Sequence, residues 1–439
     1  MAAAVAKGLD RFPLAVPLAV VAAVVYWAAT AQMLSASQLY GHYNLAFDFD
    51  PSRYINLLIA APETWSARDA AAEFWVKHPF YLMHRPIAQG LMLIGFPPVW
   101  AVLGLSIITG VLTLLVFNGI LRHLCLPDIV RAAALLLFAG SAAQVACITV
   151  PDAYSAALLG ILLAIWMVMR RAASPGRWPV QRFLLPAYLF GVTATNLIFA
   201  GIAEFALQVT TQPLVRAIRN LVIWGIVSGG LIVVLLAICY PNDMLAAAGN
   251  PVQALKSVLW IGTLEPDKTI PPAGLLTMVK TMFAFSLWAP APSVVMIPGE
   301  AAGLPPIPMH DFRVFDYGSL GLVALLGWLA LLAFGGEAML RRLWTREGLA
   351  IGLAVGAMLA FNLAFHVYFQ YRGSVFLYAG HFFPAVAVVV AFGIARLHAV
   401  AGGRAAPVAG GLLAMALVSA TNTYIQMDAI RAGIVAGGY

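Results

Sequence analysis

The chain has 439 residues, of which 62% are hydrophobic and only 10% are charged, and its formal net charge is +7. Soluble domains carry about a quarter charged residues, so this composition excludes an ordinary soluble enzyme and indicates a membrane protein. The positive charge is not gathered into basic patches interleaved with aromatic residues, and we therefore expect no nucleic-acid partner.

Several apolar runs are long enough to cross a bilayer, which takes about 20 residues as a helix. The alternating segments of a β-barrel and internal repeats are both absent. The first run follows Lys7 and Arg11 and is longer than the core of a cleaved signal peptide, so we interpret it as a span. The sequence predicts an all-α polytopic membrane protein, with residues 1–439 as a single integral membrane domain of about eleven spans. They are 12–34, 99–121, 131–149, 153–170, a short pair within 183–213, 220–240, 317–340, 347–369, 382–397 and 406–423.

Basic loops set the expected orientation. Arginines at 170–182 and 341–346 mark cytoplasmic loops, which places the N-terminus inside. We expect a multi-pass protein of the cell inner (plasma) membrane, with its active face periplasmic. Two long segments, 35–98 and 241–316, then lie on the outer side. The cysteines show no metal-binding spacing; buried free thiols are favoured over a Cys147–Cys239 disulfide.

Both outer segments contain predicted structure. A capping box at Ser66–Asp69 precedes apolar residues at helical spacing and predicts a short interfacial helix. Residues 274–295 predict a second interfacial or re-entrant helix. The prolines between 290 and 308 predict a stiff loop that ends in MHDFRVFDYG.

The stretch FDFDPSRY places Asp48, Asp50 and Arg53 directly after the first span. On an extended segment Asp48 and Asp50 point the same way, toward a shared partner or a divalent cation. Arg53 can hold the Asp50 carboxylate by a charge-assisted hydrogen bond. An aspartate at the mouth of the membrane can act as a general base toward a sugar or lipid hydroxyl. The alternative is an Asp-Pro turn in which Asp50 caps the next helix.

Two further groups of polar residues fall on the predicted outer side. Asp152 and Tyr154, in VPDAYS, lie between two closely joined spans, at the bilayer surface or in a water-filled cleft. His366, Arg372 and His381 flank a short loop, and an arginine there suits a lipid phosphate. The alternatives are an ordinary helix start for Asp152 and an aromatic-belt loop with snorkelling side chains for the second group.

Other polar residues are weaker candidates for a functional site. His310, Asp311, Arg313 and Asp316 match no metal-ligand pattern, and we interpret them as a solvated loop. Glu204 and Gln208 are polar at membrane depth, which hints at function, but we expect them near the inner mouth. Nucleotide-binding glycine loops, nucleophile elbows and zinc-protease motifs are absent from the sequence.

The order of these motifs resembles the GT-C superfamily of polytopic membrane glycosyltransferases. FDFDPSRY opens a large outer loop, KHPFY with His78 precedes the second span, VPDAYS joins two spans, and YRGSVFLYAGHFFP lies late in the chain. The resemblance implies a polyprenyl-phosphate-sugar donor, inversion at the anomeric carbon and an early aspartate as base: Asp50 first, Asp48 second. It assigns substrate binding to residues near that base and to the late basic site: Arg53, His78, Asp152, Tyr154, His366, Arg372 and His381.

One departure from the family concerns the acceptor. Many members carry a soluble C-terminal outer domain, whereas this sequence ends soon after its last predicted span. We therefore expect residues 241–316 or another protein to recognise a cell-envelope glycan or glycolipid acceptor. The rival functions are a transporter or flippase of a lipid-linked sugar and a non-catalytic subunit of a polysaccharide assembly system. A flippase predicts polar residues through the midplane of the membrane, which the sequence largely lacks.

Overall fold

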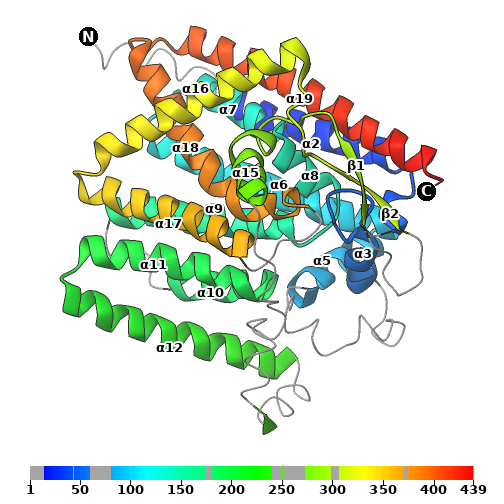
Figure 1. Ribbon diagram of the computed structural model, residues 1–439. Coiled ribbons are helices and arrows are strands. Elements are labelled where there is room, and N and C mark those ends of the chain that lie inside the picture. The colour runs from blue at the N-terminus through cyan, green and yellow to red at the C-terminus, as the bar shows by residue number, and fades with distance from the viewer. Residues whose placement is uncertain are drawn as a thin grey trace.

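The structure is a computed structural model, and it describes residues 14–42, 44–59, 81–174, 180–239, 249–250, 272–297, 306–368 and 374–438. Most of these residues are helical, and the helices pack side by side into a bundle (Figure 1). The expected helix near Ser66, His78 and the loop residue Arg372 lie outside the described residues.

Eight helices among the described residues are long and apolar enough to cross a membrane, which makes this a multi-pass membrane protein. A ninth span is possible where α7 (Asp128–Ala139) and α8 (Ala142–Thr149) meet at a bend of 63°. The predicted count of eleven is therefore not confirmed. The eight are α2 (Ala15–Leu34), α6 (Pro98–His123), α9 (Tyr154–Ala173), α12 (Leu214–Cys239), α16 (Gly318–Arg342), α17 (Arg346–Tyr368), α18 (Ala379–Val400) and α19 (Ala405–Ala436).

The predicted short pair within 183–213 is present as two helices that are too short to count as spans. They are α10 (Gln181–Val192) and α11 (Leu197–Thr211), joined by a 3-10 turn at Ala194–Asn196. Together with α12 they form a layer along one side of the bundle, below α9 and α17 in Figure 1.

Burial differs sharply between the middle and the edge of the bundle. The central helices α9 and α18 pack on each other, and 61% of the most apolar window of each is buried. Only 11% of the corresponding window of α12 is buried. Large apolar side chains along α12 face outward, which is typical of a lipid-facing helix.

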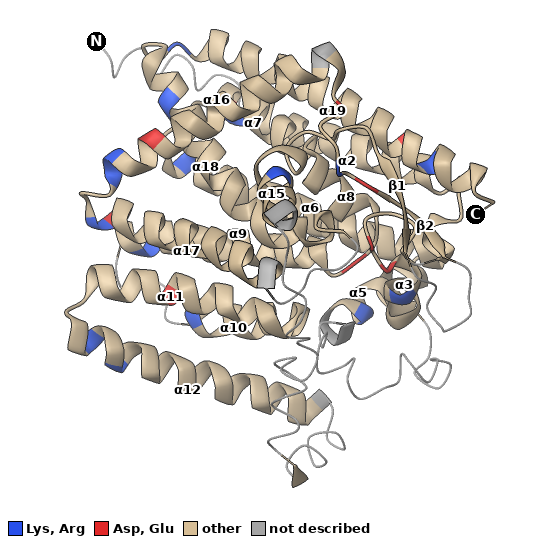
Figure 2. Ribbon diagram, viewed as in Figure 1, with Lys and Arg blue, Asp and Glu red and all other residues tan. Residues whose placement is uncertain are grey.

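Basic residues end several helices at one side of the bundle, where their charge complements the negative end of the helix dipole. Arg170 and Arg171 occupy the last turn of α9, and Arg341 and Arg342 end α16. Figure 2 shows most of the basic residues toward that side, and several acidic residues near α3, β1 and β2 toward the other. The two charged sides lie at opposite ends of the long helices.

The second predicted outer segment is helical only in part. A helix, α15 (Pro272–Lys280), continues into a π-helical turn at Thr281–Phe285, which agrees with the expected short helix. Beyond it the structure has two antiparallel strands, β1 (Ser293–Ile297) and β2 (Ile307–Asp311), which the sequence did not predict. The interpretation of His310, Asp311, Arg313 and Asp316 as a solvated loop is wrong for His310 and Asp311, which are buried, whereas Arg313 is half-buried and Asp316 is exposed.

Candidate functional site

A tight turn forms the first half of FDFDPSRY. The Phe49 amide donates to the Ala46 carbonyl at 3.0 Å, and the Asn44 amide donates to the Phe49 carbonyl at 2.9 Å. Phe47 and Asp48, at the tip, have φ of +55° and +63°. Two successive residues in this left-handed region define a type I′ turn. The predicted extended segment is therefore wrong: the chain reverses between Ala46 and Phe49.

Contacts from elsewhere in the chain hold this turn in place. The left-handed conformation of Phe47 costs free energy and persists only when surrounding structure imposes it. Here the Phe47 amide donates to the His310 carbonyl at 2.8 Å, and the His310 amide donates to the Leu45 carbonyl at 2.9 Å. The Phe47 ring packs on those of Phe312 and Phe376, at 4.8 and 4.6 Å between centroids. Strand β2 thereby joins the early turn to the late segment at 374–378.

Asp50 begins the helix α3 (Pro51–Ile59). The Tyr54 amide donates to the Asp50 carbonyl at 3.0 Å, and Pro51 occupies the first helical position, as the capping interpretation predicted. That interpretation and a functional one are compatible, because the backbone of Asp50 starts the helix while its charge raises the pKa of a second carboxyl group. Arg53 lies on the first turn of α3.

The second carboxylate belongs to Asp152, in the four-residue connection between α8 and α9. The Asp50 amide donates to Asp152 Oδ2 at 3.1 Å, and the Ala153 amide donates to Asp152 Oδ1 at 2.5 Å. Residues 102 positions apart in the sequence thus meet at one point. The structure brings together the two aspartates that the sequence placed in separate motifs.

The environment of Asp152 raises its pKa from 3.8 to about 7. Burial is the largest cause, and the negative charge of Asp50 is the second; the two backbone N–H groups and Arg53 offset part of the rise. The Asp152 carboxyl therefore gains or loses its proton near neutral pH. A group that titrates near the working pH is suited to proton transfer.

Buried aromatic residues surround the carboxylate pair on the side of α10. Burial raises the pKa of Tyr54, and the nearby Asp152 and Tyr188 raise it further, so Tyr54 stays protonated. The Tyr188 hydroxyl donates to the Ala156 carbonyl at 3.3 Å. His84, on α5 (Tyr81–Leu93), lies 6.5 Å from the Tyr188 ring, and burial lowers the pKa of His84 to about 4. His84 is therefore neutral at physiological pH.

The predicted residues Tyr154, His366 and His381 lie together in an aromatic cluster next to the pair. The Tyr154 ring is 5.6 Å from that of Phe49 and 5.2 Å from that of His381. His366 stacks on Tyr378 at 3.9 Å and lies 5.9 Å from His381. This cluster extends the site from the carboxylates toward the interior of α17 and α18.

Asp311 is a buried acidic residue whose importance the sequence did not reveal. It is 2% exposed, its Oδ1 accepts from the Ser374 hydroxyl at 2.7 Å, and its Oδ2 accepts from Arg313 Nε at 2.9 Å. Burial raises the pKa of Asp311, while Ser374, Arg313 and the Phe312 amide counteract the rise. The polar sequence suggested a solvated loop, and Met309 and Phe312, three positions apart, give no strand periodicity that would mark the segment as buried.

No group of three or more His, Cys, Asp or Glu side chains that could hold a metal ion occurs in the parts of the chain that the structure describes. Asp50 and Asp152 supply two carboxylates, and Mg²⁺ is usually bound by one or two carboxylates together with substrate phosphates. Within the same parts of the chain, Cys125 and Cys147 are free thiols, the latter buried.

No protein-family model matches the chain, and no curated protein matches it. Among solved structures it is similar to the oligosaccharyltransferase of Archaeoglobus fulgidus in its apo form, with 15% identity over 93% of this chain and a TM-score of 0.41. The same enzyme tethered by a disulfide to an acceptor peptide with an NVT sequon gives 15% identity, 93% coverage and a TM-score of 0.44. This chain spans 56% and 55% of the lengths of those two chains. Because both TM-scores are below 0.5, the proposals below rest on the contacts described above.

Proposed function

We propose that the chain is a membrane glycosyltransferase that moves a sugar from a polyprenyl-phosphate donor to a cell-envelope glycan or lipid acceptor, with inversion. The observation that carries this proposal is the pair formed by Asp50 and Asp152, where the Asp50 amide meets the Asp152 carboxylate at 3.1 Å. The pair lies at the ends of apolar membrane helices, where a lipid-borne substrate and a water-soluble acceptor can meet.

Asp50 acts as the general base in this proposal. The acceptor hydroxyl oxygen attacks the anomeric carbon as its proton passes to the Asp50 carboxylate. The bond from that carbon to the phosphate oxygen breaks, and its electron pair leaves with the lipid phosphate. Asp152 keeps Asp50 in position through the Asp50 amide, and the charge of one carboxylate raises the proton affinity of the other.

The donor is bound by the cluster beside the pair. His366, His381 and Tyr154 offer aromatic faces and ring N–H groups to a sugar phosphate, and aromatic rings pack well on the apolar faces of sugars. Arg372, two residues before Ser374, supplies the guanidinium for the phosphate. The acceptor enters from the side of β1 and β2.

The reaction takes place on the extracytoplasmic side of the plasma membrane in this proposal. Asp152 lies two residues before the start of α9, and Arg170 and Arg171 lie in its last turn. The helix has 20 residues and thus spans about 30 Å, the thickness of the hydrocarbon core. Since basic residues favour the cytoplasmic side, the carboxylate pair faces the opposite one.

A transfer assay with purified protein and a synthetic polyprenyl-phosphate sugar tests this function. We expect Asp50→Asn to lower transfer by about 10²- to 10⁴-fold while the protein still binds the donor lipid, because a missing base affects the chemical step. The matched control is Asp428→Asn, which removes an aspartate that is 45% exposed and paired with Arg431 on α19. Normal turnover in Asp50→Asn would refute the assignment of the base.

Two further experiments test whether transfer needs a divalent cation and whether the protein is a flippase instead. If the carboxylate pair holds a divalent cation, EDTA abolishes transfer by the wild-type protein and added Mg²⁺ or Mn²⁺ restores it. If the protein is a flippase, proteoliposomes move the labelled donor between leaflets without forming a glycoside, and that result contradicts the transferase proposal.

A further inference from the structure

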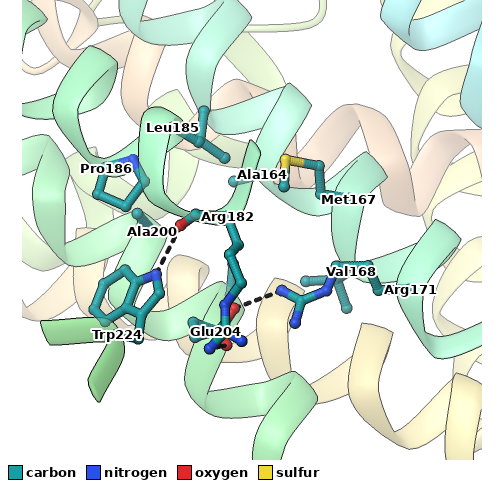
Figure 3. Close-up of a pocket in the computed structure, with 11 residues that line it drawn as sticks. Ala164, Met167, Val168, Arg171, Arg182, Leu185, Pro186, Ala200, Glu204 and Trp224 are labelled. Carbon is teal, nitrogen blue, oxygen red and sulfur yellow. Dashed lines mark hydrogen bonds and ion pairs between the residues drawn. The ribbon is translucent and has the colours of Figure 1, made fainter. Parts of the chain in front are cut away.

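A second buried charged group lies at the other end of α9, away from the proposed site. Glu204, on α11, is 4% exposed. Its Oε2 accepts from Arg171 Nη1 at 2.5 Å, and its Oε1 accepts from Arg182 Nη2 at 2.6 Å and from Gln208 Nε2 at 2.7 Å. Figure 3 shows both guanidinium groups converging on this one carboxylate.

The charges in this group do not cancel. Two guanidinium groups and one carboxylate leave one positive charge, and the arginine side chains are only 14% and 19% exposed. Each guanidinium contacts Glu204 through a single nitrogen instead of a two-bond fork. Arg182 Nε is buried and has no hydrogen-bond partner. Burying an uncompensated charge and an unsatisfied donor costs free energy, which an anionic ligand recovers.

The group lines a small recess that is partly open to the surface and is formed where α9, α10, α11 and α12 meet. Besides the three charged residues, its walls are apolar side chains, among them Met167, Leu185 and Ala203. Trp224, from the lipid-facing α12, also lines it, and its Nε1 donates to the Arg182 carbonyl at 2.8 Å (Figure 3). A charged centre with apolar walls matches an amphipathic ligand better than a free ion.

The position of Arg171 along α9 places this charged group at the level of the lipid headgroups. Arg171 lies two residues before the end of α9, about 25 Å along the axis from Tyr154 at its start. Exposed Arg216 and Arg219, at the beginning of α12, add positive charge to the same side. Basic residues at this level attract anionic lipids.

We propose that this recess binds the phosphate group of an anionic phospholipid, with Arg182 as the principal donor and Arg171 as the second. One phosphodiester charge neutralises the excess positive charge, and its oxygens accept from the guanidinium nitrogens that Glu204 leaves unused. The acyl chains extend along the apolar walls toward α12. The site is separate from the carboxylate pair and does not depend on the proposed transferase activity.

Titration of delipidated protein in detergent with short-chain phosphatidylglycerol, followed by native mass spectrometry, tests this inference. We expect phosphatidylglycerol to bind at least about tenfold more tightly than phosphatidylcholine, and Arg182→Gln to weaken binding about 10- to 100-fold, since charge-assisted hydrogen bonds contribute about 1.5–3 kcal/mol. Arg182→Gln should fold, because Glu204 keeps Arg171 and Gln208. The matched control is Arg404→Gln, at an exposed arginine that precedes α19, and it should leave binding within about twofold.

Two additional measurements test which chemical features of the arginine and of the ligand are needed for binding. Arg182→Lys keeps the charge but loses the planar guanidinium, and we expect intermediate affinity. Inorganic phosphate should compete only weakly, because it lacks the acyl chains that contact the apolar walls. Equal loss of affinity in Arg182→Gln and Arg404→Gln would overturn the site, and full competition by inorganic phosphate would replace the lipid with a free anion.

Discussion

An acidic residue lies near each end of α9, Glu204 buried and Asp152 half-buried, and the two have opposite surroundings. Glu204 is held by two arginines and an amide at 2.5–2.7 Å. Asp152 instead lies beside a second carboxylate, with only backbone N–H groups and a more distant charge from Arg53 to offset it. A satisfied carboxylate stabilises the fold, whereas a carboxylate placed next to another is costly and is suited to chemistry. Amide substitutions at the two positions should therefore have opposite effects on stability.

The largest effect on stability is expected for Glu204→Gln. Removing one charge from a buried ion pair costs about 3–5 kcal/mol because the partner charges stay buried and unpaired. Thermal unfolding in one detergent, with Glu347→Gln as control, measures this loss; Glu347 is 37% exposed and contacts His123. A change for Glu204→Gln no greater than that of the control would show that the group near α10 is not a buried charged centre.

Asp152→Asn should stabilise the protein at alkaline pH. The pKa of Asp152 is raised in the folded state, from 3.8 to about 7, so folding favours the protonated form. Its contribution to stability is therefore complete below about pH 4 and is lost as the pH rises to about 7, by at most about 4 kcal/mol. The amide does not titrate and avoids this loss.

The predicted stabilisation is tested by comparing the unfolding temperatures of Asp152→Asn and wild type at about pH 5 and pH 8. The difference should be larger at the higher pH, while transfer falls at both. A variant that is less stable than wild type at the higher pH would contradict the proposed environment of Asp152.

The pH dependence of transfer should reflect the same pair. Transfer should require the ionised form of Asp152, whose pKa is raised to about 7 by burial and by the charge of Asp50. The rate should fall about tenfold per pH unit below this value. Asp152→Asn should move the inflection to lower pH in whatever activity remains, and an unchanged profile would exclude coupling between the two aspartates.

The smallest effect is expected for Ser374→Ala, at a positioning residue. Its hydroxyl donates to Asp311 Oδ1 and accepts from the Phe376 amide, so its loss should cost about 1–2 kcal/mol. The KM for the donor should rise more than kcat falls, because the segment at 374–378 supports the donor cluster. Ser35→Ala, at an exposed hydroxyl that contacts only Gln32, is the control. Equal behaviour of the two variants would show that β2 does not position the site.

The sequence by itself determined the membrane class, most helix positions and the side of the bundle to which basic residues belong. Hydropathy and the distribution of arginine are properties of short segments, so they can be read without tertiary contacts. The helix start at Asp50-Pro51 was equally local, because capping depends on neighbouring residues. Candidate residues such as Asp50, Asp152 and His381 were identifiable for the same reason: polar groups are rare in so apolar a chain.

Only the tertiary structure decided which of these residues meet. The turn at Phe47 and Asp48 depends on hydrogen bonds from β2, more than 250 positions away, and no local rule predicts a left-handed phenylalanine. The burial of Asp311 and the pairing of Glu204 with two arginines likewise come from helices and strands that are distant in sequence. The pKa of Asp152 depends on both burial and Asp50, and these are set by packing, not by composition.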